Sequence, residues 1–462
     1  MKNKARYDII LYWKKASSLL QSIRITTEKE RRYFNMDKKQ SIHGLKGHIL
    51  FSSSKETLRV YESSYLIYEG DTVIGVYPLL PEEYAAIPIE DYGDRLIIPG
   101  LIDLHLHAPQ YTFRGLDMDM ELLDWLNANT FPEESHYQNL DYAKQAYQIF
   151  TESLRKSATT RACIFATIHR EATLLLMDLL EETGLCTMVG KVNMDRNAPD
   201  YLIEETALST AETKAWLDEV LKRSYKKTLP ILTPRFIPSC TDTLMKSLKQ
   251  LQRDYDLPMQ SHLSENFSEI AWVQELCPQS AFYGDAYDQF GLFGKDCKTL
   301  MAHCVHSDDR EIARMKENGV FIAHCPESNM NLSSGIAPAK KFLEEGLHMG
   351  LGSDIAGGTT ENLFRTMAHA LQASKLRWRL MDDTLPPLTV PEVFYLATKG
   401  GGTFFGKVGS FEAGYAADMI VLDDSRLQHP QPMTPEQRLE RLLYLADDRE
   451  IYAKYVAGKK LF

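Results

Sequence analysis

The fold is decided by the stretch Pro99-Gly100-Leu101-Ile102-Asp103-Leu104-His105-Leu106-His107. It begins with a Pro-Gly turn, continues as an apolar run typical of a buried strand, and ends in two histidines. Side chains alternate between the two faces of a β-strand, so His105 and His107 point the same way. Two imidazoles at the carboxyl end of one strand make half of a metal site. The alternative is a strand with two incidental polar residues.

Strand-like and helix-like segments alternate from residue 96 onward. Helical patterns such as 141–157 and 172–182 separate most of the strand-like runs. Continuous apolar runs joined by helices predict a parallel sheet buried on both faces. Eight such units predict an α/β fold of the (β/α)8 TIM-like barrel type. Besides 96–107, the predicted strands are 161–169, 186–192, 229–236, 257–262, 299–303, 319–324 and 348–354.

The two ends of the chain have a different character. Short β-branched and aromatic segments fill 42–98, with a hairpin turn expected at Gly70-Asp71, and a similar pattern returns after residue 405. A small sheet alone would leave an apolar face uncovered, so we expect the two ends to pair. We expect an unassigned N-terminal extension at 1–36 and the barrel at 98–406. The small β-sandwich is expected to form from 37–97 and 407–462.

Composition and charge limit the classes of function. A net charge of −11 argues against a nucleic-acid partner, and no apolar run approaches the roughly 20 residues that span a bilayer. Seven cysteines without a C-x-x-C pair indicate reduced thiols and a cytoplasmic protein. Residues 1–35 carry nine Lys/Arg against three Asp/Glu and lack the features of a secretory signal. We favour a dispensable extension or an early start codon there, with a surface helix as the alternative.

Polar residues stand at the ends of successive predicted strands, where barrels of this type carry their active sites. These residues are His105, His107, Arg235, His262, His303, His324 and Asp354. The best metal set is His105, His107, His262 and Asp354, because three neutral imidazoles and a carboxylate suit zinc and also tolerate iron. A water bound to such a metal has a pKa near neutrality, and Asp354 is placed to accept its proton.

Other residues beside these strand ends have two readings each. Glu265, three residues after His262, is predicted to protonate a substrate nitrogen, with helix capping as the alternative. His303 is expected to be a further ligand or a hydrogen-bond donor, and His324 to act in the site or to hold the bordering loop. Cys304 and Cys325 alternate away from the site and are expected to be buried neutral thiols. Whether the segment 117–134 forms a lid stays open.

The same segments resemble the amidohydrolase superfamily and, more closely, its guanine-deaminating family. The resemblance covers roughly residues 40–460 and leaves the first 35 unmatched. It is carried by the stretches 99–107, 107–115, 233–236, 260–266, 323–335, 351–358 and 409–418. The family converts guanine to xanthine and ammonia by a zinc-activated water, so the resemblance implies this activity, one zinc ion per chain and a homodimer. No lysine ends the fourth strand to bridge a second metal.

The resemblance also implies a role for each matching residue. The zinc ligands would be His105, His107, His262 and Asp354, with Glu265 as the proton shuttle. The residues that recognise the purine would be Gln110, Arg235 and Phe236, while His262, Glu265 and Asp354 also contact it. Gln110 offers a donor and an acceptor, Arg235 only donors, and Phe236 a stacking face. The alternatives are a salt bridge for Arg235 and a core ring for Phe236.

Two rival functions follow from the same residues. One is another zinc aminohydrolase of the superfamily, acting on a different purine, a pterin or a triazine, because exchanged contacts change specificity without changing the fold. The other is a non-catalytic scaffold on the same barrel. A scaffold predicts lost ligands, whereas all the expected ligands are present.

Overall fold

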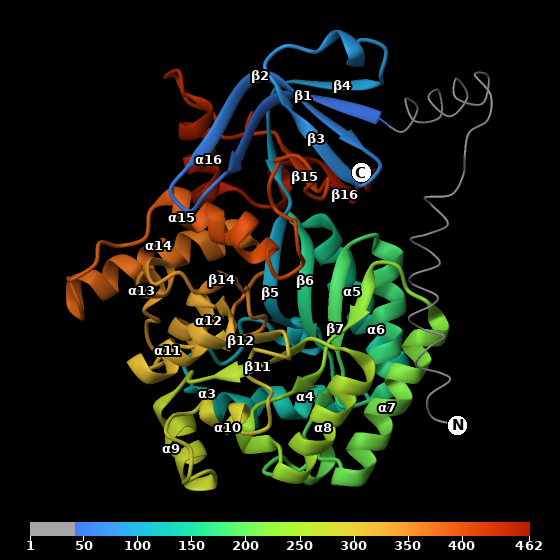
Figure 1. Ribbon diagram of the computed structural model, residues 1–462, viewed down its shortest axis with the longest axis vertical. Helices are drawn as coiled ribbons and strands as arrows, with labels where there is room; N and C mark the ends of the chain where they lie inside the picture. Colours follow the sequence, from blue (N-terminus) through green and yellow to red (C-terminus); the bar gives the residue numbers. More distant parts are fainter. Residues whose placement is uncertain (1–41) are drawn as a thin grey trace.

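The computed structural model describes residues 42–462, and the N-terminal extension expected at 1–36 lies outside them. A small β-sheet lies at one end of the molecule and a larger α/β body at the other (Figure 1). The chain passes from strand β4 (Ile89–Pro99) through Gly100 into strand β5 (Leu101–His107). A side chain at Gly100 would collide with Thr160, whose Oγ1 lies 2.2 Å from where a Cβ would stand, so only glycine fits this junction.

Both ends of the chain contribute to the small sheet. Its other strands are β1 (Ile42–Ser52), β2 (Leu58–Glu69), β3 (Thr72–Tyr77), β15 (Met419–Leu422), β16 (Ile451–Val456) and β17 (Lys459–Lys460). Their order across the sheet is β17-β16-β15-β4-β1-β2-β3. β4 therefore joins the two halves, because it pairs with β1 on one side and with β15 on the other. The expected pairing of the chain ends is present.

The small sheet has a core of its own. The predicted turn at Gly70-Asp71 connects β2 and β3, and Gly70 has a φ of +57° that favours glycine. Aromatic side chains from both halves meet on one face, where the rings of Phe51 and Phe411 lie 5.7 Å apart. The strands form one hydrogen-bonded sheet, so the sandwich arrangement stays a prediction.

The body contains the parallel strands expected from the apolar runs. They are β5, β6 (Thr159–Phe165), β7 (Cys186–Gly190), β8 (Val192–Asn193), β9 (Thr228–Pro230), β10 (Thr233–Pro234), β11 (Met259–Leu263), β12 (Thr299–His303), β13 (Phe321–His324) and β14 (His348–Leu351). Their sheets have the orders β5-β6-β7-β9, β10-β8 and β11-β12-β13-β14. Backbone hydrogen bonds link these groups, from Gln260 N to Leu232 O on one side and from Asp354 N to His105 O on the other.

The run expected as one strand at 229–236 is divided into β9 and β10. Pro230 and Pro234 have no backbone N–H and cannot donate to a strand ladder. The chain consequently leaves β7 after Pro230 and pairs with β8 at Thr233. This division brings Arg235 and Phe236 to the carboxyl ends of the neighbouring strands.

Helices follow most of the parallel strands and surround them (Figure 1). The predicted helix at 172–182 is confirmed, and it ends at Gly184, whose φ of +79° is the usual left-handed helix end. The helices are α3 (Leu122–Trp125), α4 (Phe131–His136), α5 (Leu140–Lys156), α6 (Arg170–Thr183), α7 (Thr206–Arg223), α8 (Asp242–Tyr255), α9 (Phe267–Leu276), α10 (Asp285–Asp288), α11 (Asp309–Asn318), α12 (Pro326–Asn331), α13 (Ala339–Glu344), α14 (Leu363–Leu380), α15 (Val390–Tyr395) and α16 (Pro435–Leu445). Among the described residues, no helix has the length and apolar character required to cross a membrane.

Candidate functional site

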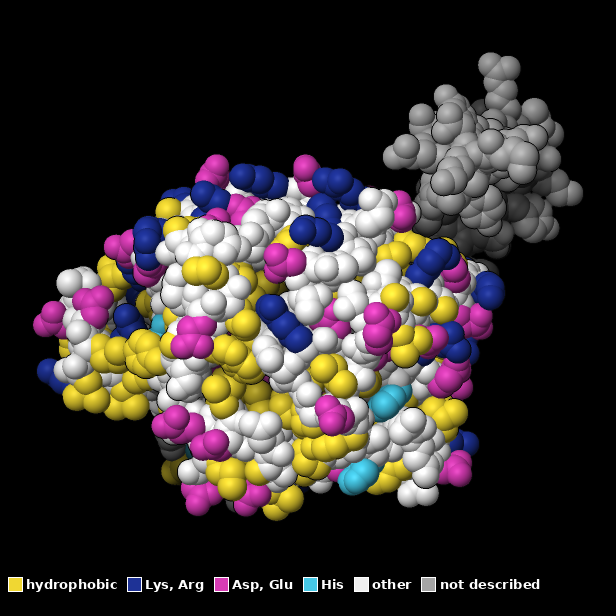
Figure 2. All heavy atoms as spheres, turned by 90° about the horizontal axis from the view of Figure 1, so that it is seen from below, with side chains coloured by type: hydrophobic (Ala, Val, Ile, Leu, Met, Phe, Trp, Pro, Cys, Tyr) yellow, Lys and Arg dark blue, Asp and Glu magenta, His cyan; other side chains and the backbone are white. Residues whose placement is uncertain are grey.

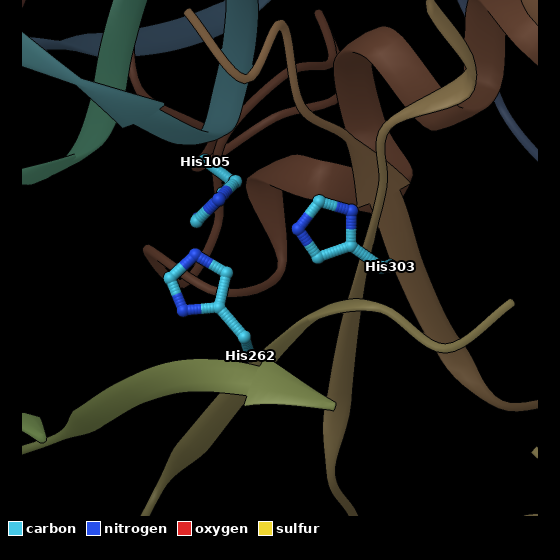
Figure 3. Close-up of side chains that lie close together, drawn as sticks. All are labelled: His105, His262 and His303. Atoms are coloured by element: carbon cyan, nitrogen blue, oxygen red, sulfur yellow. The ribbon is translucent and has the colours of Figure 1, made fainter. Parts of the chain in front are cut away.

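A cluster of buried histidines lies where the parallel strands end. His105 and His107 end β5, His262 lies near the end of β11, His303 ends β12, and Asp354 follows β14. Figure 3 shows the rings of His105, His262 and His303 facing one another from separate strands. Ligand atoms of these three lie within 4.8 Å of one another, as do those of His105, His107 and Asp354. The structure thus brings all four predicted metal ligands together, with His303 beside them.

Distances within the cluster fit a shared metal ion. Asp354 Oδ1 lies 3.1 Å from His105 Nε2 and 3.5 Å from His107 Nε2. His262 Nε2 faces His107 Nε2 at 3.2 Å, while His262 Nδ1 lies 2.6 Å from the carbonyl oxygen of Arg235. A carbonyl only accepts, so Nδ1 of His262 carries the proton and its Nε2 presents a lone pair to the cluster. A backbone partner that fixes the tautomer in this way is typical of metal-binding histidines.

Burial sets the protonation of these groups. Burial lowers the pKa of His107 and of His262 well below the ordinary histidine value, so both rings are neutral. Burial alone would raise the pKa of Asp354, but the neighbouring histidines outweigh it and hold that pKa well below the usual range. Neutral imidazoles and an ionised carboxylate are the forms that bind a metal. The donor set therefore fits a divalent ion.

The backbone near the cluster adopts conformations that non-glycine residues rarely take. The φ angles are +73° at His303, +51° at Cys304, +48° at Asp354 and +47° at Ser264. Each such residue costs free energy, of order 1–3 kcal/mol, and persists only where its surroundings impose it. Their concentration at the ends of β11, β12 and β14 marks this region as the functional end of the fold.

Glu265 is fully inside the molecule, beside the cluster. Its Oε1 accepts a hydrogen bond from Ser334 Oγ at 3.1 Å, and its Oε2 lies 3.3 Å from His303 Nε2. Burial, followed by the charge of Asp354, raises the pKa of Glu265 well above the ordinary value, which favours the protonated carboxyl. Helix capping does not explain this residue, because Asn266 caps α9.

His303 is held by a residue that the sequence analysis did not single out. Its Nδ1 lies 2.9 Å from Asn329 Oδ1 on α12, which leaves Nε2 directed at Glu265 and Asp354. His324 is buried at the end of β13, and burial lowers its pKa to about 4. Burial raises the pKa of Cys304 and Cys325 well above the ordinary thiol value, which agrees with the expected neutral thiols. The expectation that Cys325 points away from the site is wrong, because its Sγ lies within 4.8 Å of ligand atoms of His303 and Asp354.

A cavity opens onto the cluster, and all three residues expected to recognise a purine line it. Its wall contains His107, Gln110, Leu122, Trp125, Leu126, Arg235, Phe236, His262, Glu265, Glu269, His303, Leu332, Asp354 and Gly357. Leu122, Trp125 and Leu126 come from the segment 117–134, so that segment forms part of the wall. Phe236 lies edge-on to Trp272, with ring centroids 6.4 Å apart.

Two buried carboxylates beside the cavity were missed by the sequence analysis. Glu134 on α4 accepts hydrogen bonds from Gln110 and Arg235, so the alternative of a salt bridge for Arg235 is present together with its place in the cavity wall. Glu269 on α9 accepts from the backbone N–H of Glu265, and burial raises the pKa of Glu269 to about 7. For Glu269, the only signal in the sequence was the spacing Asn266-x-x-Glu269, which is typical of a helix capping box.

Comparison with known proteins agrees with this geometry. The amidohydrolase family model matches residues 96–461. The chain is 38% identical to the guanine deaminase of Dictyostelium discoideum over 378 residues, which cover 80% of this chain and 83% of that protein. It is 36% identical to the guanine deaminase of Escherichia coli (strain K12) over 388 residues, covering 81% and 85%.

Solved structures point the same way. The guanine deaminase from C. acetobutylicum, solved with guanine bound in its active site, superposes with a TM-score of 0.88 at 46% identity and covers 91% of this chain and all of that one. An adenosine deaminase from Xanthomonas campestris with bound zinc has a TM-score of 0.75 at 21% identity, covers 90% of this chain and 92% of that one, and shares the fold. The α/β architecture is thus shared with solved guanine deaminases, and the histidine cluster offers groups that could hold a metal ion. The chain belongs to the amidohydrolase family and, within it, to the guanine deaminases.

Proposed function

We propose that this protein hydrolyses guanine to xanthine and ammonia. The observation that carries the proposal is one cavity that combines the histidine cluster, the buried Glu265 and the polar pair Gln110 and Arg235. A relative of 46% identity holds guanine in its active site. An uncharged base that offers both donors and acceptors fits a cavity edge made of an amide and a guanidinium.

The proposed metal site consists of His105, His107, His262 and Asp354. We propose one zinc ion per chain, with iron as the alternative, because the donor set suits both. Such an ion, when bound, lowers the pKa of water and supplies a nucleophile at neutral pH. The lone pair that His262 Nε2 presents and the ionised Asp354 support this assignment.

The protein residues then have distinct tasks. Gln110 and Arg235 bind the edge of the purine and Phe236 packs on its face, which holds C2 toward the cluster. As water adds to C2, Asp354 accepts its proton and Glu265 protonates the adjacent ring nitrogen. Glu265 then takes the proton of the added hydroxyl and passes it to the amino group, so that C2=O forms, the C2–N bond breaks and ammonia leaves, and the proton held by Asp354 returns to Glu265. His303 Nε2, 3.3 Å from Glu265 Oε2, orients that carboxyl.

Turnover by metal-quantified protein tests the proposal. Xanthine and ammonia should form in equal amounts from guanine, with about one zinc per chain and none of this activity after chelation. Adenine and cytosine serve as control substrates, since the rival aminohydrolase function would favour another ring. Absence of product with zinc bound would reject guanine as the substrate, and product formation after complete metal removal would reject the metal site.

The same evidence supports a proposal about architecture. We propose that the parallel strands close into an eight-stranded barrel at 98–406, because backbone hydrogen bonds join their sheets at Leu232 and at His105. The small sheet would wrap into a sandwich formed by 37–97 and 407–462, whose shared aromatic core supports it.

We also propose a cytoplasmic homodimer that binds no nucleic acid or membrane. The seven cysteines are all free, as expected in a reducing compartment. Hydrophobic side chains gather on the projection at the left of Figure 2, where α14 extends from the body in Figure 1. Leu376, Leu380 and Met381 are exposed there and would be covered by a second subunit.

A further inference from the structure

Glu134 lies behind the edge of the cavity and connects the two polar residues that form it. It is 0% exposed. Its Oε2 accepts from Arg235 Nη1 at 2.7 Å, and its Oε1 accepts from Gln110 Nε2 at 3.0 Å. One carboxylate therefore holds two side chains that come from separate parts of the chain, while Glu134 itself belongs to α4.

These bonds fix the orientation of the Gln110 amide. Its Nε2 donates to Glu134, and its Oε1 accepts from the backbone N–H of Ala356 at 3.1 Å. An amide flipped by half a turn would direct its NH2 at the Ala356 N–H and its oxygen at a carboxylate, so both contacts would be repulsive. Gln110 consequently presents one defined donor and one defined acceptor to the cavity.

The same carboxylate removes the net charge of Arg235. The guanidinium is 3% exposed, and its Cζ also lies 5.3 Å from the centroid of the Phe131 ring. A buried guanidinium without a carboxylate partner attracts an anion, whereas a paired one offers its remaining N–H groups as neutral donors. A guanidinium has about five N–H donors, so the bond to Glu134 commits only part of them.

We propose that Glu134 is a positioning residue that fixes the hydrogen-bonding edge of the cavity and, by neutralising Arg235, makes the cavity select an uncharged purine over an anionic one. This inference rests on the proposed function and specifies how that site chooses its substrate. Its two parts, position and charge, are separable by substitution.

Glu134→Gln keeps the shape of the side chain and removes its charge. We expect the KM for guanine to rise about 10- to 100-fold, as for the loss of a charged hydrogen bond, with a smaller change in kcat. Binding of urate, a planar purine anion, should tighten at least about tenfold because Arg235 is no longer neutralised. Zinc content should stay unchanged. Urate affinity equal to that of the wild type would overturn the charge argument.

Glu134→Asp keeps the negative charge but shortens the side chain by one methylene, which moves the carboxylate away from Gln110 and Arg235. The KM for guanine should rise, while urate affinity should stay at the wild-type value, because charge is retained and position is lost. This variant also covers the case in which Glu134→Gln fails to fold. Wild-type KM in Glu134→Asp would overturn the positioning argument.

Glu133→Gln is the matched control on the same helix. Glu133 accepts from Thr112 and Tyr142 and makes neither of the hydrogen bonds that Glu134 makes to Gln110 and Arg235, so guanine KM and urate affinity should both match the wild type. Urate binding is measured by calorimetry without turnover. Failure of the wild type to produce xanthine would therefore reject the proposed function and leave the charge comparison of Glu134 intact as a separate result.

Discussion

Two buried polar side chains at opposite ends of the parallel strands, Lys454 and His107, differ in whether their nitrogen atoms have hydrogen-bond partners. At the amino end, Lys454 on β16 is 0% exposed, and its Nζ donates to the carbonyl oxygens of Leu154, Arg155 and Ser157. At the carboxyl end, Nδ1 of His107 and of His324 are buried without a partner in the described residues. Unpaired buried polar groups cost free energy unless a ligand satisfies them. The paired Lys454 joins the small sheet to the body, whereas the His107 ring belongs to the proposed metal site.

The largest effect is expected from Glu265→Gln at the carboxyl end. An amide cannot pass a proton between ring nitrogen and leaving group, so turnover of guanine should fall by about 10²- to 10⁴-fold. Zinc content and the unfolding temperature should stay at wild-type values, since Glu265 is outside the proposed ligand set. Xanthine formation and metal analysis check both. Residual turnover within tenfold of the wild type would remove Glu265 from the mechanism.

Lys454→Met tests the amino ends of the parallel strands, where a substitution should change the free energy of unfolding but not the turnover of guanine. The substitution keeps much of the side-chain volume but removes the hydrogen bonds to three carbonyl oxygens, of which only that of Leu154 keeps another side-chain donor in the described part of the chain, Ser157 Oγ. We expect the free energy of unfolding to fall by about 3 kcal/mol, measured by denaturant titration. The kcat/KM of the folded protein should stay within about twofold of wild type, since the site is at the other end.

Lys459→Met provides the control for that experiment. Lys459 is an exposed lysine on β17, three residues after the buried Val456, so its removal should change unfolding by less than about 0.5 kcal/mol. Equal destabilisation by both substitutions would mean that Lys454 contributes no more to stability than a surface lysine. The proposed structural role of the buried lysine would then be rejected.

The smallest effect is expected from thiol reagents. Cys304 and Cys325 lie next to strand-end histidines, but burial raises the pKa of both thiols well above the ordinary value, so few thiolates exist at pH 7 to 8. Iodoacetamide should leave the activity of the native protein unchanged, and mass spectrometry should find both residues unmodified until denaturant is added. Rapid inactivation by modification of either cysteine would show that its thiol is accessible and reactive, which contradicts the expected buried neutral thiol.

The candidate ligands could be predicted because their signal is local. His105, His107, His262 and His303 each end an apolar run, and the rule that parallel strands end on one side places them together. The division of the run at 229–236 was also visible in principle, since Pro230 and Pro234 interrupt it. The positions of the apolar runs were therefore easier to predict than their division into strands, since the runs at 186–192 and 229–236 each form two strands.

Glu134 and Glu269 could not be predicted in the same way. Glu134 is 24 residues from Gln110 and 101 residues from Arg235, and no spacing rule relates them. The contacts of Glu134 with Gln110 and Arg235 depend on how α4 packs over the strand ends. The left-handed backbone at His303 and Asp354 is equally hidden, because nothing about these residue types requires it and only the surrounding fold imposes it.

The junction of the small sheet sets the order in which the protein can be completed during synthesis. β4 ends at Pro99, and its neighbour β15 begins at Met419, so 319 residues lie between two adjacent strands. At about 5–20 residues per second, a ribosome needs roughly 15–60 s to make that intervening stretch. For that time β4 has an unpaired edge, which is a template for pairing with other chains. During synthesis, the strand order of the small sheet therefore leaves its N-terminal half without its neighbour β15 until the whole body has been made.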